Sequence, residues 1–330
     1  MKKTPLLAAG LVLSLVLPAQ AEKPVLTIYT YDSFVSSWGP GPAVKEAFEA
    51  DCGCTLDLVG TGDGAALLAR IRLEGARSPA SLVLGLDTNL TANAAATGLF
   101  APHGLSPALD LPVAWEDPHF LPFDWGAFAF VYDTTRLETP PRSFAELAAS
   151  DLSIVIQDPR SSTPGLGLLM WVDKTQGDGA GAMWAALSPR ILTVTRGWSE
   201  AYGMFLEGEA DMVLSYTTSP AYHAIAEDDD SKAFAPFEEG HYLQVEVAGM
   251  LANAPQPELA RQFLAFMTGP VFQGIIPTTN WMFPVAASAG GLPEGFPAPL
   301  PAEASLLYSP EEAAARRDAA LEDWLAGLGR

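Results

Sequence analysis

Cysteine, histidine and basic side chains are scarce in this chain of 330 residues, which has 2 Cys, 4 His and 18 Lys+Arg against 39 Asp+Glu. Zinc and iron–sulfur centres need several Cys or His ligands, so the sequence predicts no metal site. The net charge of −21 argues against nucleic-acid binding, because phosphate recognition requires clustered Lys and Arg. The acidic surface favours solubility, and it is also compatible with binding of a small cationic ligand.

The first 21 residues have the three parts of a secretory signal peptide. Lys2 and Lys3 form a positive n-region, residues 6–17 form an apolar h-region, and residues 19–21 (Ala-Gln-Ala) form a cleavage site. The apolar run is too short to span a bilayer comfortably, and no second long apolar run follows it. We therefore expect cleavage after Ala21 and export from the cytoplasm.

The two cysteines, Cys52 and Cys54, are separated by a single glycine. In an oxidising compartment they could close a C-x-C disulfide, because the glycine relieves the tight ring. A metal or redox role would need further ligands or a C-x-x-C spacing, and the sequence has neither. We therefore favour a structural disulfide.

Short β-branched runs alternate with helical stretches, which predicts an α/β fold whose mainly parallel sheet carries helices on both faces. Two long extended segments, 123–132 and 241–250, bracket a second α/β set. They predict two crossover strands that act as a hinge between two lobes, with a ligand cleft between the lobes. The predicted division is a signal peptide at 1–21, lobe 1 at 22–124 plus 246–330, and lobe 2 at 125–245.

Residues 60–65 (GTGDGA) match the G-x-G-x-x-[GA] pattern of dinucleotide sites, and Asp87 lies about 20 residues further on. However, this loop follows the second predicted strand rather than the first, and NAD is scarce outside the cell. We therefore favour a ligand loop that presents Asp63 and backbone N–H groups, and we expect no cofactor.

Two strand-to-helix junctions in the second α/β set end in Ser or Thr followed by Pro. At the first, Thr163 is predicted to be the N-cap, with Pro164 in the first helical position. Ser219 and Pro220 repeat this arrangement. Free N–H groups together with the hydroxyls of Ser162 and Thr163 would form a cradle for a phosphate or carboxylate. A plain capped helix is the alternative.

Aromatic residues gather near the predicted strand ends, where each fits either a packed core or the wall of a cleft. Such rings could stack on a flat cationic heterocycle, worth roughly 0.5–2 kcal/mol each. Catalytic patterns are poor, because residues 197–201 lack the second glycine of a nucleophile elbow and the histidines lack metal-pair spacing. The aromatic positions are Tyr31, Trp38, Trp198, Tyr216, Tyr222 and Trp281.

Long blocks of this sequence resemble the periplasmic thiamine-binding proteins of bacterial ABC importers. The resemblance implies a type II periplasmic-binding fold and a location in the periplasm. It also implies capture of thiamine, thiamine monophosphate and thiamine diphosphate for delivery to a membrane permease and its ATPase, without catalysis, by a chain that we expect to be monomeric. The blocks include 29–54, 83–90, 157–169 (QDPRSSTPGLGLL), 193–223, 239–248 and 277–286 (PTTNWMFPVA).

The resemblance also implies which residues hold the ligand. Asp63 would compensate the positive charge of the thiazolium ring, while Ser162 and Thr163 would line its hydroxyl or phosphate end. Tyr222 and Trp281 would stack on the two rings. The full implied set is Asp63, Gly64, Ser162, Thr163, Trp198, Tyr216, Thr217, Thr218, Ser219, Tyr222 and Trp281, with Tyr31 and Trp38 as additions.

Two other functions on the same fold stay open. An enzyme that modifies thiamine would need a Cys nucleophile in the cleft, and we expect both cysteines on the far side of their strand from it. A related binder of ferric iron or an anion is the other alternative. Iron would need clustered Tyr, His and Asp ligands, but Tyr216 and Tyr222 lie six residues apart and no consecutive Tyr-Tyr pair occurs.

The signal peptide yields the first testable prediction. The exported protein should begin at Glu22, because the small residues at 19 and 21 fit the cleavage pocket of signal peptidase. The intact mass of the protein recovered from the periplasm would check this. A mature chain that retains residues 1–21, or begins elsewhere, would contradict it.

Overall fold

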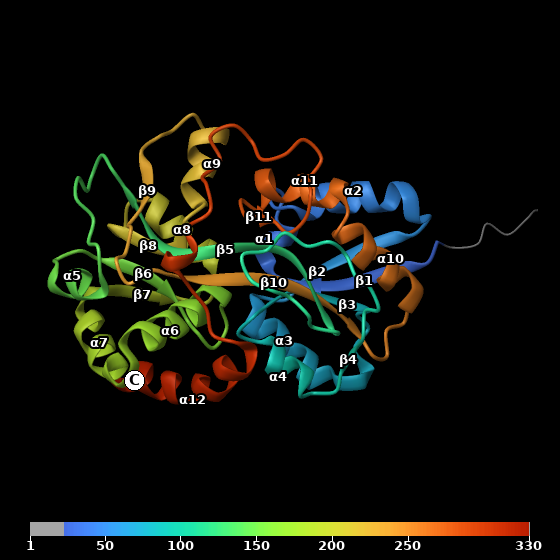
Figure 1. The fold of residues 1–330 in the computed structure, drawn as a ribbon, viewed down its shortest axis with the longest axis horizontal. Coiled ribbons are helices and arrows are strands. Elements are labelled where there is room, and N and C mark those ends of the chain that lie inside the picture. Colours follow the sequence, from blue (N-terminus) through green and yellow to red (C-terminus); the bar gives the residue numbers. More distant parts are fainter. Residues whose placement is uncertain (1–22, 330) are drawn as a thin grey trace, which may run out of the picture.

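Two long strands, β5 (Phe120–Asp133) and β10 (His241–Leu251), pair antiparallel through the middle of the molecule and connect its two lobes (Figure 1). The structure is a computed structural model that describes residues 23–329, so the predicted signal peptide lies outside the described residues. Every residue of β10 and all of β5 except Asp133 is buried. The expectation of two crossover strands between lobes is confirmed.

Lobe 1 is built on the parallel strands β2, β1 and β3, with β10 antiparallel to β3. Helices cover both faces of this sheet. Its elements are β1 (Val25–Thr30), α1 (Asp32–Val35), α2 (Gly41–Cys52), β2 (Thr55–Gly60), α3 (Gly64–Glu74), β3 (Leu82–Asp87), α4 (Thr91–Ala95) and β4 (Phe100–Ala101), followed after β10 by α10 (Pro257–Met267), α11 (Pro270–Thr279) and β11 (Phe283–Pro284).

Lobe 2 repeats this plan with the strand order β5-β8-β6-β7, in which β6 is parallel to both neighbours and β8 is antiparallel to β5. Its elements are α5 (Phe144–Ala149), β6 (Ile154–Gln157), α6 (Thr163–Gln176), α7 (Ala180–Leu187), β7 (Ile191–Thr195), α8 (Trp198–Leu206), β8 (Met212–Tyr216), α9 (Ser219–Ala226) and β9 (Lys232–Phe234).

The sheet as a whole is mixed, which corrects the expectation of a mainly parallel one. Within each lobe the strands that alternate with helices are parallel. The two crossover strands break this pattern, since β5 carries the chain from lobe 1 into lobe 2 and β10 carries it back. Strands that run in opposite directions side by side must pair antiparallel.

The last helix, α12 (Pro310–Gly327), lies against α6 and α7 of lobe 2 and also touches α4 of lobe 1 (Figure 1). The sequence-based division placed all of 246–330 in lobe 1, so this part of it is corrected. The physical reason is the small-residue face of α12, where Ala313 and Ala320 are buried and Trp324 enters the core. The preceding strand β12 (Ser305–Leu306) pairs with β10.

The disulfide between Cys52 and Cys54 is present and joins the end of α2 to the start of β2. Gly53 between them has φ 62, in the left-handed region that glycine adopts without strain. The predicted structural bridge is therefore confirmed. It lies in lobe 1, away from the cavity described below.

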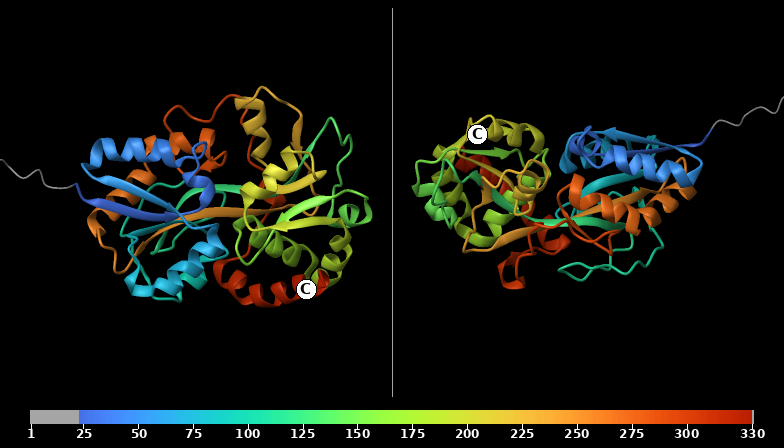
Figure 2. Two further views of the ribbon diagram at one scale, coloured as in Figure 1. Left: turned by 180° about the vertical axis from the view of Figure 1, so that it is seen from behind. Right: turned by 90° about the horizontal axis from the view of Figure 1, so that it is seen from above.

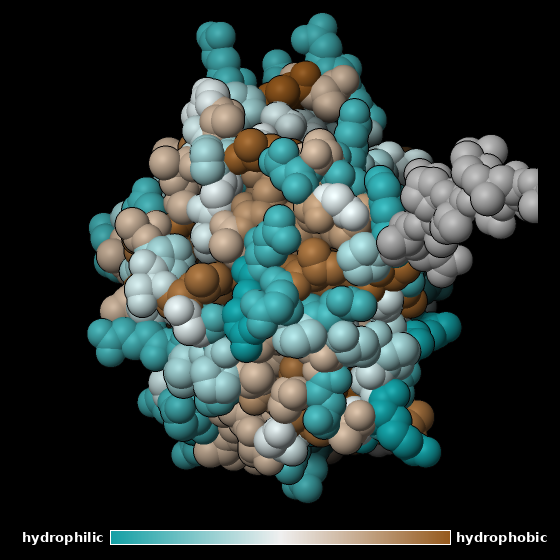
Figure 3. All heavy atoms as spheres, turned by 90° about the vertical axis from the view of Figure 1, so that its right-hand side faces the viewer, coloured by the Kyte–Doolittle hydropathy of each residue, from teal (hydrophilic) through white to brown (hydrophobic). Residues whose placement is uncertain are grey.

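Seen from above, the two lobes are distinct and are connected by the crossover strands (Figure 2). Over the end of lobe 1, hydrophilic and apolar side chains interleave (Figure 3), so single exposed residues such as Leu73 need no special partner. Among residues 23–329, no helix combines the length and apolarity needed to cross a membrane.

Close packing between α6 and β5 yields a stability prediction. A methyl group at Gly167 would lie 2.0 Å from the fully buried ring of Phe128, so Gly167→Ala should lower the free energy of unfolding by roughly 1–3 kcal/mol. A methyl group at Gly203, also helical, would meet nothing within 4 Å, so Gly203→Ala should raise it by about 0.5–1 kcal/mol. Urea unfolding of both variants checks this, and equal shifts would contradict it.

Candidate ligand-binding cleft

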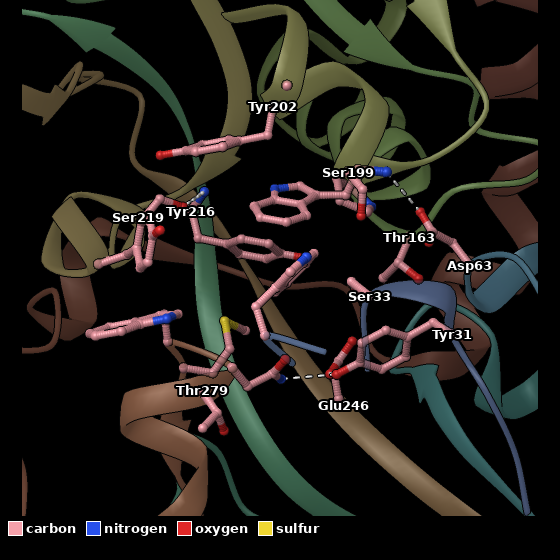
Figure 4. A pocket seen from close by; sticks show the side chains of 18 of the residues that line it. Tyr31, Ser33, Asp63, Thr163, Ser199, Tyr202, Tyr216, Ser219, Glu246 and Thr279 are labelled. Carbon is pink, nitrogen blue, oxygen red and sulfur yellow. Dashed lines mark hydrogen bonds between the residues drawn. The ribbon is translucent and has the colours of Figure 1, made fainter. Parts of the chain in front are cut away.

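A cavity of about 310 Å³ lies between the lobes, beside the crossover strands. This volume is in the range of small-molecule sites, roughly 300–1,000 Å³. Figure 4 shows Tyr202 on one side of it and Tyr31 on the other. The lining residues are Tyr31, Ser33, Trp38, Asp63, Thr163, Pro164, Trp198, Ser199, Tyr202, Gly203, Leu206, Tyr216, Ser219, Tyr222, Glu246, Thr279, Asn280, Trp281 and Met282.

Aromatic rings form two walls of the cavity. In the first, Trp198 stacks on Tyr202 with ring centroids 4.9 Å apart, and Trp38 from lobe 1 lies 6.1 Å from Trp198. In the second, Tyr222 and Trp281 meet edge to face at 5.5 Å. Trp281 has φ 55, a left-handed conformation that is costly for a bulky side chain and is found mainly where function requires it.

Hydrogen bonds hold the ring hydroxyls in place. His223, buried in α9, contacts the hydroxyl of Tyr202 at 2.9 Å through Nε2 and a carboxylate oxygen of Glu227 at 2.7 Å through Nδ1. The hydroxyl of Tyr222 donates to the other oxygen of Glu227 at 2.7 Å. His223 therefore holds the hydroxyl of Tyr202, and Glu227, which His223 contacts, holds that of Tyr222.

The lobes meet at Asp63, which sits just before α3. The hydroxyl of Ser162 donates to its carboxylate at 2.8 Å, and the backbone N–H of Trp198 donates to the same oxygen at 3.3 Å. Next to it, the backbone N–H of Gly64 donates to Oγ1 of Thr163 at 3.0 Å. All three bonds join lobe 1 to lobe 2, so the structure is a closed form of the cleft.

These contacts change the interpretation of the first Ser/Thr-Pro junction. Ser162, not Thr163, is the N-cap of α6, and its hydroxyl is fully buried against Asp63. At the second junction Thr218, not Ser219, is the N-cap of α9. Within the cradle expected at Ser162 and Thr163, the hydroxyl of Ser162 donates to Asp63, whereas Thr163 only accepts a bond from Gly64 and keeps its own O–H for a further acceptor.

Two glycine N–H groups of the loop at 60–64 are already bound within the protein and are not free for a pyrophosphate. The N–H of Gly62 donates to Asp32 at 2.9 Å, and that of Gly64 is bound to Thr163. The loop therefore contacts α1 through Asp32 and places Asp63 at the cleft. This geometry supports the ligand loop over the dinucleotide site.

Burial controls the charge of the acidic side chains around the cavity. Desolvation raises the pKa of Asp63 to about 6, although the hydrogen bonds from Ser162 and Trp198 favour its charged form. Desolvation also raises the pKa of Glu246 well above its usual range, and the nearby charge of Asp124 acts in the same direction. No Lys or Arg is among the described residues that line the cavity.

The structure brings most of the sequence-predicted residues together. Nine of them line the cavity, among them Tyr31, Asp63 and Thr163, together with Trp38 and Trp198. Four others lie behind the lining: Gly64, Ser162, Thr217 and Thr218, the last three buried at 6 % exposure or less. The other predicted residues in the lining are Tyr216, Ser219, Tyr222 and Trp281.

Sequence reasoning missed Glu246, Asn280, Tyr202 and Met282, which also line the cavity. A signal existed for Glu246, because a charged residue within the apolar run at 241–250 is rare unless it has a function. Asn280 precedes Trp281 in a block that had been recognised by resemblance. Tyr202 and Met282 look like ordinary core residues in the sequence, so no comparable signal marked them.

Comparisons with known proteins agree with this two-lobed architecture. Residues 40–274 match the family of bacterial extracellular solute-binding proteins. The chain is 54% identical over 311 residues to the thiamine-binding periplasmic protein of Escherichia coli, covering 93% of this chain and 94% of that one.

Among solved structures, a periplasmic thiamin binding protein matches with a TM-score of 0.90 at 53% identity, covering 96% of this chain and 100% of that one. Iron-bound HitA from Pseudomonas aeruginosa matches with a TM-score of 0.74 at 20% identity, covering 92% and 99%, which shows a shared fold alone.

The bond between Ser162 and Asp63 predicts how the cleft opens. Ser162→Ala leaves a buried carboxylate without one donor, which should weaken lobe closure by about 1–3 kcal/mol. Small-angle X-ray scattering should then show a larger radius of gyration. Ser161→Ala is the matched control, because its hydroxyl bonds only to the carbonyls of Arg196 and Asp158, both within lobe 2. Identical scattering from both variants would contradict the prediction.

Proposed function

The chain belongs to the bacterial extracellular solute-binding protein family, and we propose that it captures thiamine in the periplasm as the binding component of an ABC importer. The observation that carries this proposal is the cavity between the lobes. It combines aromatic walls from both lobes with two carboxyl groups, Asp63 and Glu246, and no basic side chain among the described lining residues. The names of the similar proteins support the same ligand.

The chemistry of thiamine fits this lining. Its thiazolium ring carries a permanent positive charge, which is attracted to the faces of rings such as Trp198 and Trp281 by about 0.5–2 kcal/mol each. Its aminopyrimidine ring is flat and forms hydrogen bonds at its edge. Asn280 and Ser199 provide polar groups for such bonds between the aromatic walls.

The proposal extends to thiamine monophosphate and thiamine diphosphate. Thr163 and Pro164, at the start of α6, line the cavity, and a helix N-terminus favours an anionic group. The phosphate tail would lie there and would accept a hydrogen bond from the hydroxyl of Thr163, whose oxygen accepts from the N–H of Gly64. Since no basic side chain of the described lining matches the tail, thiamine itself suits the cavity best.

Release of the intact ligand to a membrane permease with its ATPase completes the proposed role. The protein would act as a monomer in the periplasm, the location named for its relatives. We propose binding and delivery without catalysis, a role that the names of the similar binding proteins support.

The tyrosine side chains argue against ferric iron as the cargo. The hydroxyls of Tyr31, Tyr202 and Tyr216 donate to or contact Glu246, His223 and Gln244. Desolvation raises the pKa of all three phenols, which opposes the phenolate form that iron requires. The shared fold of iron-binding proteins is therefore not matched by a suitable ligand set in this cavity.

Calorimetry of the mature protein with thiamine and its two phosphate esters tests the proposal. Trp281→Ala should weaken thiamine binding by roughly 1–3 kcal/mol, because a stacking ring is lost. Trp281→Phe keeps a ring and should retain most of the affinity. The tryptophan fluorescence of the wild type should change when thiamine is added. Absence of thiamine binding by the wild type would refute the proposed function.

A further inference from the structure

Three carboxyl groups lie side by side on β3 and the two crossover strands, β10 and β5. Glu246 of β10 is in register with Asp87 of β3 on one side and with Asp124 of β5 on the other. Directly opposed residues of an antiparallel pair have side chains on the same face. Each of the three is at most 5 % exposed. Adjacent acids at this depth need either positive partners or protons.

Positive partners are missing for two of the three. No ion pair within residues 23–329 involves Glu246 or Asp124. Among the described residues, the one cation that acts on these three carboxyl groups is Arg317, whose charge favours ionisation of Asp87. Asp87 also accepts a hydrogen bond from Asn89 at 2.9 Å. Glu246 and Asp124 are therefore the uncompensated members of these three.

The hydrogen bonds of this pair leave room for one proton. Tyr31 donates to Glu246 Oε2 at 2.9 Å, and Asn280 donates to Asp124 Oδ2 at 2.6 Å (Figure 4 labels Tyr31 and Glu246). The second oxygen of Asp124, Oδ1, is buried and receives no hydrogen bond from the described residues. A proton carried by Glu246 would supply the donor that this oxygen lacks.

Glu246 also faces the place where a ligand would lie. It lines the cavity together with Tyr31, Asn280 and Trp281. A cation that enters the cavity therefore comes close to this carboxyl group. Asp63, the acid that sequence reasoning favoured for this purpose, already accepts two hydrogen bonds from lobe 2.

We propose that Glu246 and Asp124 share one proton in the empty cleft and release it to solvent when the cationic ring of the ligand enters. The inference rests on the proposed thiamine function. The pair then changes from one negative charge to two, and the ligand brings one positive charge. The net charge of the pair and the ligand together therefore stays at one negative charge, so ligand entry adds no further net charge to the buried cluster.

The surroundings act in the direction that this exchange needs. Burial and the neighbouring carboxyl raise the pKa of Glu246, and the charge of Asp87 adds to the effect. The other titratable groups around the pair are Tyr31, Tyr216 and Asp63, of which the two phenols are neutral. A cation beside the pair lowers the pKa of both acids. Affinity should therefore rise with pH, by at most about tenfold per pH unit.

Calorimetry in buffers of different ionisation enthalpy counts the protons exchanged on binding. At about pH 7, wild-type protein should release about one proton per thiamine bound. Deazathiamine, in which a neutral ring replaces the thiazolium, should bind without this release. A proton exchanged by the aminopyrimidine ring would appear with both ligands, so the comparison isolates the effect of the positive charge.

Two variants assign the proton to the pair. Glu246→Gln and Asp124→Asn should each bind thiamine without releasing a proton, because each removes one of the two carboxyl groups that share it. Asp87, whose charged form is favoured by Asn89 and Arg317, is unchanged in both variants. Glu246→Gln should also bind more weakly, with an affinity that varies little with pH. Glu258→Gln, an exposed change outside the cavity, should behave as wild type.

The outcomes separate this inference from the proposed function. Thiamine binding by the wild type without proton release overturns the shared proton and leaves the proposed function standing. Equal release by wild type and both variants overturns the assignment to this pair. If neither variant folds, equal release with thiamine and deazathiamine overturns the inference, and release with thiamine alone supports it. If the wild type binds no thiamine, the proposed function and the inference both fail.

Discussion

The pairing of β5 with β10 is the constraint on which the rest of the structure depends. These strands carry the chain out of lobe 1 and back, and their other edges continue into the sheets of the two lobes. Because both are almost wholly buried, every backbone group must be paired in one register. This register places Glu246 opposite Asp124 on the two strands that connect the lobes.

An apolar pair would be less costly than two acids at this position. Burying a charge without a partner costs several kcal/mol, whereas hydrophobic residues of similar size pack without that penalty. The acids lie next to Tyr31 and Asn280, and Glu246 itself lines the cavity, whereas Asp124 is fully buried behind it. In the proposed proton exchange, the free-energy cost of burying these two acids is linked to the recognition of a positively charged ligand.

Closure of the lobes and recognition of the ligand use neighbouring groups. Asp63 of lobe 1 accepts bonds from Ser162 and from the backbone of Trp198, and the ring of Trp198 forms part of the aromatic wall. Whatever lies against that ring therefore also affects the bonds that hold the lobes together. A ligand between the lobes adds contacts only in the closed form, which shifts the population toward closure.

The sequence by itself determined the local structure and the ligand class. Its alternating runs predicted the main strands of both lobes, its two long extended segments predicted the crossovers, and its glycine-bridged cysteines predicted the disulfide, whereas shorter elements such as α7, α11 and β9 were not predicted. Only the tertiary structure decided which groups meet. It placed α12 on lobe 2, directed Ser162 toward Asp63 and set Glu246 beside Asp124. Periodicity and capping act within a few residues, whereas these contacts join residues about a hundred or more positions apart, which only the packing of complete lobes brings together.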